Sequence, residues 1–531
     1  MIGRRKFMYT LRLPLKTSCN IEAVLEKRFG LMEKIHNQVV NHAKTLLTKL
    51  YKNKEYQLLK TDYFVWKQKA EAGDTMASVQ KDIIADKMNK HREAIGLSKN
   101  AFDKYVSDMQ HKYKKNISAH QAQVEAERVW SGVEKVLFGD GKDVHYKKGK
   151  EFRTIRGKNH ETGIFFRTKY NKKASQRKHP EFFIEWGKLI IPVKLPNINR
   201  HDLPNDGNYI LQALSGGKIK YCEVVRLWFK SGWRYYANVY FDDDAPKKLQ
   251  PGKGTMGLDE GPSTAAAVSE NAVFLEELAP KCIDYNKKIA KLQRQVDLST
   301  RHTNPDKFNE DGTAKKKSEY KGQRWVFSKS CLRKKAEIRE LYRKKSEYST
   351  HMHGNLTNRM ISSSSIFVVE PMDFKALAKR AKETKRQNKP SVIKTSDGSE
   401  KTVYKYKRKR RFGKSVTDRS PAELITILQR KCSQYALLYY EVDKWEYRAS
   451  QYDHTTNIYT KVQLSQRYKD IGGHSVQRDL YSAFLLSCRW YSKKPSRKKC
   501  KSLFNNFVKM HDALIDNMKK RQISRPACFG F

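Results

Sequence analysis

The stretch GTMGLDEGPSTAAAVSE, residues 254–270, decides the fold of the second half of the chain. A short apolar run in it ends in Asp259, the turn residues Gly261 and Pro262 follow at once, and a second run, TAAAVS, begins. Together with the run AVFLEEL at 272–278, this pattern predicts three short strands joined by turns. A carboxylate beside an apolar run is costly to desolvate without a partner. Asp259 is therefore expected to face a metal ion, an arginine or water.

The charge of the chain is its strongest bulk property. The 531 residues include 108 Lys and Arg against 56 Asp and Glu, a net charge of +52. A field of that size strains a compact protein unless a polyanion neutralises it. The basic residues are spread along most of the sequence, which favours a phosphate backbone over a membrane surface.

Length and apolar patterning give further expectations. The length favours two to four domains, and 28 Tyr, 23 Phe and 8 Trp argue against disorder. No apolar run approaches the roughly 18 residues that a membrane span needs, and no signal peptide is visible at the start. The eight Cys include no CxxC pair. We expect a cytoplasmic protein with free thiols and no membrane partner.

The first half reads as a strand, a helical insertion and a β-region. The segment KFMYTLRLPL alternates like a strand with one buried face, and the helical segment after it is expected to be capped by Asn20. Further helices are expected to start at Ser98 and Ser118. Residues 138–247 are short, basic and turn-rich, which predicts a β-domain that includes the opening strand, with a hairpin turning at Ser231–Gly232. Four aromatic residues there are expected to pack across strands more than to stack on bases: Trp228, Trp233, Tyr235 and Tyr236.

The second half places three acids at the ends of elements. After the Asp259 strand and two more come basic helices and a fully apolar strand, 366–369, which ends in Glu370. The next helix is expected to begin with Ser420 as cap, a proline at its first position and Glu423 completing a capping box. The segment EVDKWEYRA is expected to form the next strand, and Asp479 falls in the first turn of a later helix. This order is that of an RNase H-like fold.

Three neighbouring carboxylates repel one another unless cations lie among them. Two Mg²⁺ ions about 4 Å apart fit such a site, one activating water and the other stabilising the leaving 3′ oxygen. Each acid alone also has an ordinary explanation. Asp259 could belong to an ordinary turn after an apolar run, and Glu370 could simply face water after its strand. Asp479 could stabilise the dipole of its helix from the first turn.

Three motifs carry a resemblance to a known family. GLDEGPSTAAAV, IFVVEPMDF and HSVQRDLYSAFLL resemble the RuvC motifs of TnpB-type transposon-encoded nucleases and their relatives, the compact type V CRISPR effectors. The resemblance implies that Asp259, Glu370 and Asp479 are the catalytic metal ligands. It also implies a guide RNA, a double-stranded DNA target cut by a single RuvC site, and a protein acting as monomer or dimer.

The resemblance implies an α+β, multidomain architecture. Residues 1–20 would open a wedge-like β-barrel, 21–137 would form an inserted helical recognition lobe, 138–250 the rest of the barrel, and 251–531 an RNase H-like (RuvC) nuclease domain. Two other functions remain open: an RNA-guided DNA-binding repressor with weak or no cleavage, and an RNase H-fold transposase or integrase.

Two departures from the family pattern stand out. The family often has a four-cysteine zinc ribbon between its second and third motifs, but this interval holds only Cys432, so zinc is not expected. A segment at about 447–476 takes its place. His454 and His474 in it could bind a metal, but two lone histidines are more often surface residues, and that is the expectation for both. The third motif usually has Asn two residues after its Asp, where this chain has Tyr481.

Basic residues are expected to bind nucleic acid. Between the second and third motifs lies a basic insertion, 375–419, and Arg478 beside Asp479 is expected either to contact the scissile phosphate or to face solvent. An A-form duplex is held through its backbone, so dispersed cations suffice. The residues expected to make such contacts, besides Arg478, are Lys147, Lys148, Lys150, Arg153, Arg156 and Lys158 in the β-region and Lys407, Arg408, Lys409, Arg410 and Arg411 in the insertion.

Overall fold

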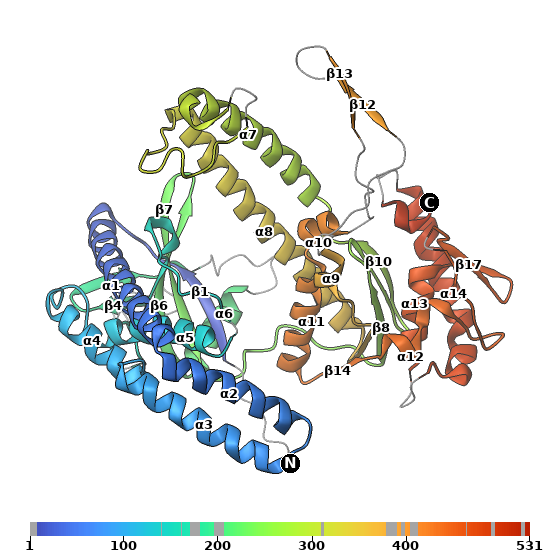
Figure 1. Cartoon of the computed structure of the whole chain (residues 1–531). Helices are drawn as coiled ribbons and strands as arrows, with labels where there is room; N and C mark the ends of the chain where they lie inside the picture. The colour runs from blue at the N-terminus through green and yellow to red at the C-terminus, as the bar shows by residue number, and fades with distance from the viewer. Residues whose placement is uncertain are drawn as a thin grey trace, which may run out of the picture. The chain divides into compact units, whose positions relative to one another are not determined.

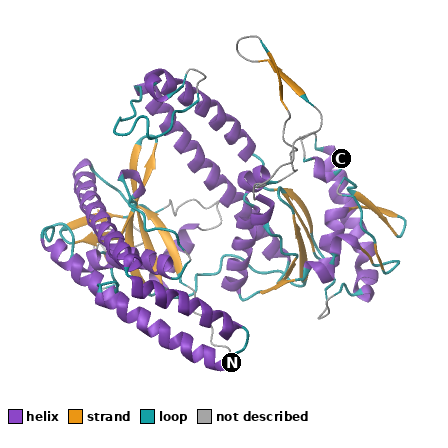
Figure 2. Ribbon diagram, in the orientation of Figure 1, coloured by secondary structure: helices purple, strands orange, loops and turns teal. Residues whose placement is uncertain are grey.

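The computed structural model of the chain contains two compact units, Met1–Pro246 (unit 1) and Lys247–Phe531 (unit 2). Figures 1 and 2 show their helices and strands. The structure describes residues 8–531 except 140, 161, 170–180, 196–205, 310–312, 379–389, 395–398, 404–411, 464, 490–493 and 522–525. Among the described residues, no helix is both long enough and apolar enough to cross a membrane.

Unit 1 begins with a strand and a group of helices. The helices are α1 Cys19–Lys52, α2 Lys54–Glu71, α3 Thr75–Ala94, α4 Lys99–His111, α5 Ala119–Leu137 and α6 Asp206–Gly216. Helix α1 is capped by Ser18, which accepts a hydrogen bond from the Ile21 N–H, so the expected cap at Asn20 is wrong. The caps at Ser98 and Ser118 are confirmed, the latter as a full capping box with Gln121.

The strands of unit 1 form two sheets. A four-stranded antiparallel sheet has the order β1-β7-β6-β2, and a three-stranded sheet has the order β3-β4-β5. The strands are β1 Tyr9–Pro14, β2 Thr154–Arg156, β3 Phe165–Lys169, β4 Glu181–Trp186, β5 Leu189–Pro192, β6 Ile219–Phe229 and β7 Gly232–Phe241. Strand β1 pairs with β7 from Tyr9–Phe241 to Pro14–Tyr236, and the β6–β7 hairpin pairs Phe229 with Gly232.

The closed barrel expected from the resemblance is not found in the described residues. Strand β2 ends at Arg156, and the chain turns between Gly157 and Gly163 before β3 starts, so no continuous ladder joins β2 to β3. A single bridge, Leu15 to Val193, connects the far sides of the two sheets. The two sheets and helices α1, α4 and α5 share one hydrophobic core.

Unit 2 is built on a five-stranded sheet of order β10-β9-β8-β11-β14. Its strands are β8 Thr255–Glu260, β9 Thr264–Val268, β10 Val273–Glu277, β11 Ile366–Val369 and β14 Leu438–Glu441. The first three form an antiparallel meander, while β11 runs parallel to β8 and β14 parallel to β11. The three strands expected from residues 254–278 and the strand 366–369 are therefore confirmed. The remaining strands are β12 Ser391–Lys394, β13 Glu400–Val403, β15 Tyr452–Asp453, β16 Ile458–Tyr459, β17 Tyr468–Ile471 and β18 His474–Gln477.

Helices cover both faces of this sheet (Figure 1). Helices α8 and α11 pack on one face through a core that includes Met256 and Leu258 of β8, and α13 and α14 pack on the other through Ala266 and Val268 of β9. The helices of unit 2 are α7 Cys282–Thr303, α8 Lys329–Ser363, α9 Phe374–Ala378, α10 Gly413–Arg419, α11 Pro421–Tyr435, α12 Lys444–Tyr447, α13 Arg478–Ser487 and α14 Arg497–Lys520. All eight cysteines are free thiols, with Cys19 exposed, Cys528 half-buried and the others buried.

Two local predictions in unit 2 are wrong. Ser420 has a positive φ of 49° and makes no side-chain cap, and Glu423 instead accepts hydrogen bonds from Ser349 and Thr350 of α8. The strand expected at EVDKWEYRA ends at Glu441, and the chain then forms the short helix α12 because Asp443 accepts a hydrogen bond from the Trp445 N–H.

Candidate active site

The sheet of unit 2 brings Asp259 and Glu370 to one edge and one face. Strands β8 and β11 are parallel neighbours with Leu258 opposite Val369, so the next residue of each, Asp259 and Glu370, lies at the same end of the sheet. Adjacent strands lie about 4.8 Å apart. Side chains alternate between faces, and Leu258 and Val369 pack toward α8 and α11. Asp259 and Glu370 therefore both point to the face covered by α13.

Helix α13 brings Asp479 to the same place because Gly257 lets it approach the sheet. A Cβ atom at Gly257 would lie 2.0 Å from the Ala483 carbonyl oxygen and 2.5 Å from the Ser487 nitrogen. Only glycine allows this backbone-to-backbone contact. Asp479 is in the first turn of α13, as expected from the sequence.

The three carboxylates are close enough to influence one another. Burial raises the pKa of Asp259 well above its usual range, and the negative charges of Asp479 and Glu370 raise it further. The charge of Arg478 and a hydrogen bond with Ser482 act in the opposite direction without cancelling the rise. Burial also raises the pKa of Glu370. All three acids are half-buried, so the site is partly shielded from water yet open to a ligand.

Arg478 does not face solvent, so that alternative is wrong. Its side chain is buried and lies 3.3 Å from the Asp479 carboxylate. It also donates to the carbonyl oxygens of Gln463 and Gln466 at 3.4 and 3.3 Å. These contacts hold Arg478 against the carboxylate it neighbours in sequence.

The donor set suits a hard cation. Three carboxylates supply only oxygen ligands, and the pKa of Asp259 is raised first by burial and then by the negative charges of Asp479 and Glu370. Among the described residues, no group of three or more His, Cys, Asp or Glu side chains lies close enough together to hold a metal ion, and the three carboxylates are no exception. The carboxylates would therefore have to draw together around bound ions.

Sequence reasoning missed four residues that shape this site. Gly257 permits the close approach of α13, Ser482 on that helix offsets part of the rise in the pKa of Asp259, and the charge of Lys444 offsets part of the rise in the pKa of Glu370. Glu260 points to the opposite face and is 2% exposed, and its Oε1 has no hydrogen-bond partner among the described residues. Burial and the neighbouring Asp259 raise the pKa of Glu260. A glycine inside an apolar strand was the only signal in the sequence for any of these roles.

The segment in place of a zinc ribbon is held by aromatic packing. His454 is 1% exposed, its Nδ1 lies 2.8 Å from the Tyr481 hydroxyl, and its ring lies 4.7 Å from that of Phe504. The expectation that His454 is a surface residue is therefore wrong, while His474 is exposed as expected. Tyr481 thus replaces the Asn of the family motif with a core hydrogen bond.

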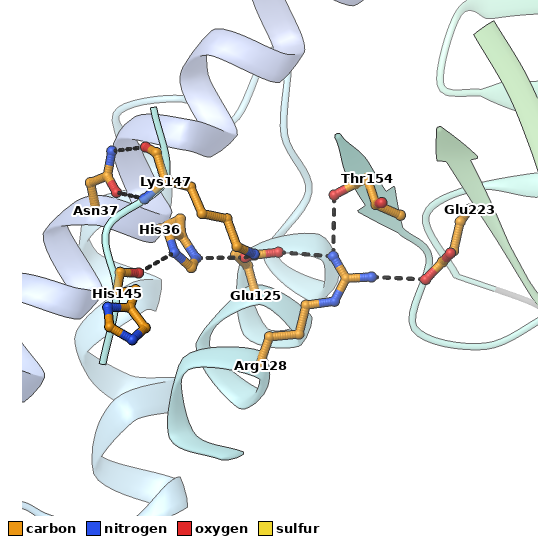
Figure 3. A network of polar contacts seen from close by, with 8 residues as sticks. All are labelled: His36, Asn37, Glu125, Arg128, His145, Lys147, Thr154 and Glu223. Atoms are coloured by element: carbon orange, nitrogen blue, oxygen red, sulfur yellow. Dashed lines mark hydrogen bonds and ion pairs between the residues drawn. The ribbon is translucent and has the colours of Figure 1, made fainter. Parts of the chain in front are cut away.

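A buried polar network in unit 1 fixes helices α1 and α5 to the sheet (Figure 3). Glu125 accepts hydrogen bonds from His36 Nδ1 at 2.7 Å and from Arg128 at 3.1 Å. Arg128 also donates to Glu223 at 2.8 Å and to the Thr154 carbonyl at 3.1 Å. Burial alone would raise the pKa of Glu125, but the hydrogen bond from His36 and the charge of Arg128 outweigh it and lower the pKa.

The same network holds the basic segment 147–158 in place. Asn37 donates to the Lys147 carbonyl at 2.7 Å and accepts from its N–H at 2.9 Å (Figure 3). Lys148, Arg153 and Lys158 are exposed. These three cations are therefore displayed on a fixed backbone.

Lys150 and Arg156 instead lie over aromatic rings. The Lys150 ammonium is 3.1 Å from the Trp228 ring centroid, and Arg156 is 3.7 Å from that of Tyr221. Trp228 faces Trp233 across the hairpin at 5.0 Å. The expectation that the hairpin aromatics pack across strands is confirmed for this pair.

The basic run Lys407–Arg411 lies outside the described residues, as do residues 379–389, 395–398 and 404–406 of the insertion around it. The ends of that insertion form α9 and α10, and the hairpin of β12 and β13 lies within it. The nucleic-acid contacts expected of Lys407–Arg411 therefore remain a prediction.

Comparison with known proteins gives distant similarities. No protein-family model and no curated protein matches the chain. Among solved structures, the chain is similar to the Cas12f1–sgRNA–target DNA complex, with 13% identity over 91% of this chain and 98% of that chain and a TM-score of 0.45. It is also similar to a CRISPR-Cas12f ternary complex (13% identity, 90% and 98% coverage, TM-score 0.24) and to the Cas12i–crRNA–dsDNA complex (9% identity, 96% and 72% coverage, TM-score 0.28).

These structures are type V CRISPR effector complexes, the group that the three sequence motifs resemble. Because every TM-score is below 0.5, we base the function of the chain on its carboxylates and not on these similarities.

Proposed function

We propose that this chain is an RNA-guided, Mg²⁺-dependent DNA endonuclease whose unit 2 is an RNase H-like, RuvC-type nuclease. The observation that carries the proposal is that Asp259, Glu370 and Asp479 lie at one edge of the sheet, where burial and then the other two charges raise the pKa of Asp259. A nuclease needs such a concentration of negative charge to hold divalent cations at a phosphodiester.

The strand order of unit 2 supports an RNase H-like sheet. Counted along the chain, the order is third, second, first, fourth and fifth strand, and the second runs antiparallel to the other four. The central first and fourth strands end in the first two acids, and the helix that lies on them supplies the third. The resemblance of the three sequence motifs to type V effectors is our reason for assigning the helices of 21–137 to a recognition lobe and the sheets of 138–250 to a wedge-like region.

The residues of the site have separate roles in the proposed reaction. Asp259, Glu370 and Asp479 would hold two Mg²⁺ ions, which when bound supply an activated water and stabilise the leaving 3′ oxygen. Arg478 orients the Asp479 carboxylate, and the Ser482 hydroxyl donates a hydrogen bond to the Arg478 carbonyl. Partial burial strengthens each of these contacts by lowering the local dielectric.

Guide RNA and target DNA are proposed as partners because of the charge and the motifs. A net charge of +52 requires a polyanion, and the exposed cations at Lys148, Arg153 and Lys158 suit the backbone of an RNA scaffold or heteroduplex. We propose that the protein acts as a monomer or a dimer.

The proposal is tested on the full chain purified with its bound nucleic acid. We expect RNase, and not DNase, to remove that nucleic acid. A DNA target matched to the sequenced RNA should be cut in Mg²⁺ and left intact in EDTA. Asp259→Ala should abolish cutting and retain target binding, because it removes a metal ligand without touching the basic surfaces. As a control, Asp297→Ala removes an exposed acid on α7 that pairs with Arg301 one turn away, and cutting should be unchanged.

Other results would assign a different function. Binding without cutting by the unaltered chain in Mg²⁺ would identify an RNA-guided repressor. Strand transfer that survives RNase treatment would identify a transposase or integrase. Cutting by Asp259→Ala at the unaltered rate would show that the site is elsewhere.

A further inference from the structure

An open pocket lies directly beside Glu370. Strands β11 and β14 are parallel neighbours, so the segments that follow them, 371–373 and 442–445, leave the sheet at the same edge as the carboxylates. Between these segments is a pocket of about 390 Å³. This volume falls in the range of about 300–1,000 Å³ that is typical of small-molecule sites.

The wall of the pocket includes Trp445, an aromatic side chain that is unusually exposed to solvent. Trp445 is 78% exposed, the largest value for a large apolar side chain among the described residues. Pro371, Met372 and Val442 supply further apolar surface. An indole left in water beside a pocket presents a flat face to a planar ligand.

The charges around the pocket favour a neutral ligand group inside it. Asp373 and Asp443 line it, with one carboxylate oxygen of each accepting a backbone N–H, from Ala376 and Trp445 respectively. The pocket contains one cation, Lys444, whose ammonium lies 5.3 Å from the Trp445 ring centroid. Two carboxylates against one ammonium disfavour a phosphate within the pocket, while Lys444 can contact a phosphate at its rim.

We propose that this pocket binds an unpaired nucleobase of the DNA strand being cut, with the base stacked on Trp445 and its flanking phosphate directed toward Glu370. The inference rests on the proposed function, since it names the form of DNA that the carboxylates receive. Stacking is sequence-tolerant because every base has an aromatic face. A base can enter the pocket only when it is unpaired, so the substrate is single-stranded at the cut.

The test measures base stacking without cleavage. The probe is a short thymidine-rich single-stranded DNA with one central 2-aminopurine, whose fluorescence falls when it stacks on an aromatic ring. It is added to the RNA-loaded Asp259→Asn chain. We expect binding to quench the probe. Adding Trp445→Ala should remove the quenching and weaken binding about tenfold, equivalent to about 1.4 kcal/mol. Trp445→Phe should keep most of both effects.

Two controls make the result specific. Tyr440→Ala removes another exposed aromatic residue, on the neighbouring strand β14 but outside the pocket, and should leave the quenching unchanged. Replacing the 2-aminopurine nucleotide by an abasic one should weaken binding to the Asp259→Asn chain but not to the Trp445→Ala double variant. Circular dichroism should be the same for all variants, because Trp445 contributes little to the core.

The outcomes separate this inference from the proposed function. If Trp445→Ala leaves quenching and affinity unchanged while the unaltered chain cuts its target, the base pocket is wrong and the nuclease assignment stands. If the unaltered chain does not cut but the quenching depends on Trp445, the pocket stands and the nuclease assignment fails. If Trp445→Ala binds the probe normally and changes only the oligomeric state, Trp445 is a protein contact and the inference is overturned.

Discussion

The buried Glu125 of unit 1 and the half-buried Asp259 of unit 2 meet the cost of desolvation in opposite ways. Around Glu125, His36 and Arg128 supply hydrogen bonds and positive charge, and the pKa is lowered. Around Asp259 the nearest ionised groups are two more carboxylates and one arginine, and the pKa is raised. The first arrangement stabilises the fold, while the second holds charge that the chain itself does not neutralise.

This difference distinguishes a structural acid from a functional one. A carboxylate whose partners are all supplied by the chain needs no ligand. A cluster of carboxylates that repel one another is stable only if the fold forces them together, and it gains stability when cations bind. The four predictions below test both sides of the comparison.

The largest effect is expected from a substitution that keeps helix α13 from packing closely on strand β8, the contact that brings Asp479 to Asp259. Gly257→Ala places a methyl group 2.0 Å from the Ala483 carbonyl, against backbone that cannot move aside, so unit 2 should lose more than about 3 kcal/mol of stability. Gly354→Ala in α8, where a Cβ meets nothing within 4 Å, should instead stabilise by roughly 0.5–1 kcal/mol. Urea unfolding of both variants measures the difference, and equal midpoints would contradict the role given to Gly257.

A smaller effect is expected from breaking the buried polar network of unit 1, in which Arg128 pairs with Glu125 and Glu223. Arg128→Ala leaves Glu125 and Glu223 buried without their shared cation, which should cost about 3 kcal/mol. The matched control is Lys67→Ala on α2, whose partner Glu71 is exposed, with an expected loss of about 0.5 kcal/mol or less. A loss at Arg128 no larger than that at Lys67 would show that the network is not structural.

Removing the negative charge of Asp259 from the group of three carboxylates should stabilise unit 2. Below the ordinary Asp pKa, about 4, Asp259 is protonated and neutral in both the folded and the unfolded state, so it does not reduce stability. As the pH rises, the unfolded state ionises first because the folded pKa is raised, so the metal-free chain loses stability until folded Asp259 also ionises. Asp259→Asn should remove this loss and gain on the order of 1 kcal/mol at neutral pH. Thermal unfolding in EDTA across pH measures it, and a variant less stable than the unaltered chain would contradict the prediction.

The smallest effect is expected at the hydrogen bond that replaces the family's Asn. Tyr481→Phe removes the hydroxyl that contacts His454 and should cost about 1 kcal/mol, with target cutting retained. Loss of cutting without loss of stability would instead place Tyr481 in the catalytic site.

The sequence predicted the central strands because their apolar runs are bounded by turn residues. It also predicted that the three acids stand at the ends of elements that an RNase H-like order brings together. It could not predict that Arg478 and His454 are buried, because their burial depends on chain that is distant in sequence: the Gln466 carbonyl for Arg478 and the Phe504 ring for His454.

The errors also have physical causes. The capping box at Ser420 failed because residues of α8 hydrogen-bond the Glu423 carboxylate. The strand expected at 441–449 failed because one carboxylate, Asp443, starts a helical turn. The closed barrel was carried over from a resemblance, and the short β2 does not extend far enough to join β3. A tertiary contact decided the first case, a local cap at Asp443 the second, and the length of a strand the third.

Because most of the cysteines are buried, their reactivity can report the local unfolding of each unit. Unit 1 has a single buried thiol, Cys222, and unit 2 has five: Cys282, Cys331, Cys432, Cys488 and Cys500. A brief exposure to an alkylating reagent should therefore modify the exposed Cys19 in the native protein, and Cys222 only when unit 1 opens. Mass spectrometry of the modified peptides would then follow the opening of the two units separately in one sample, without any engineered label.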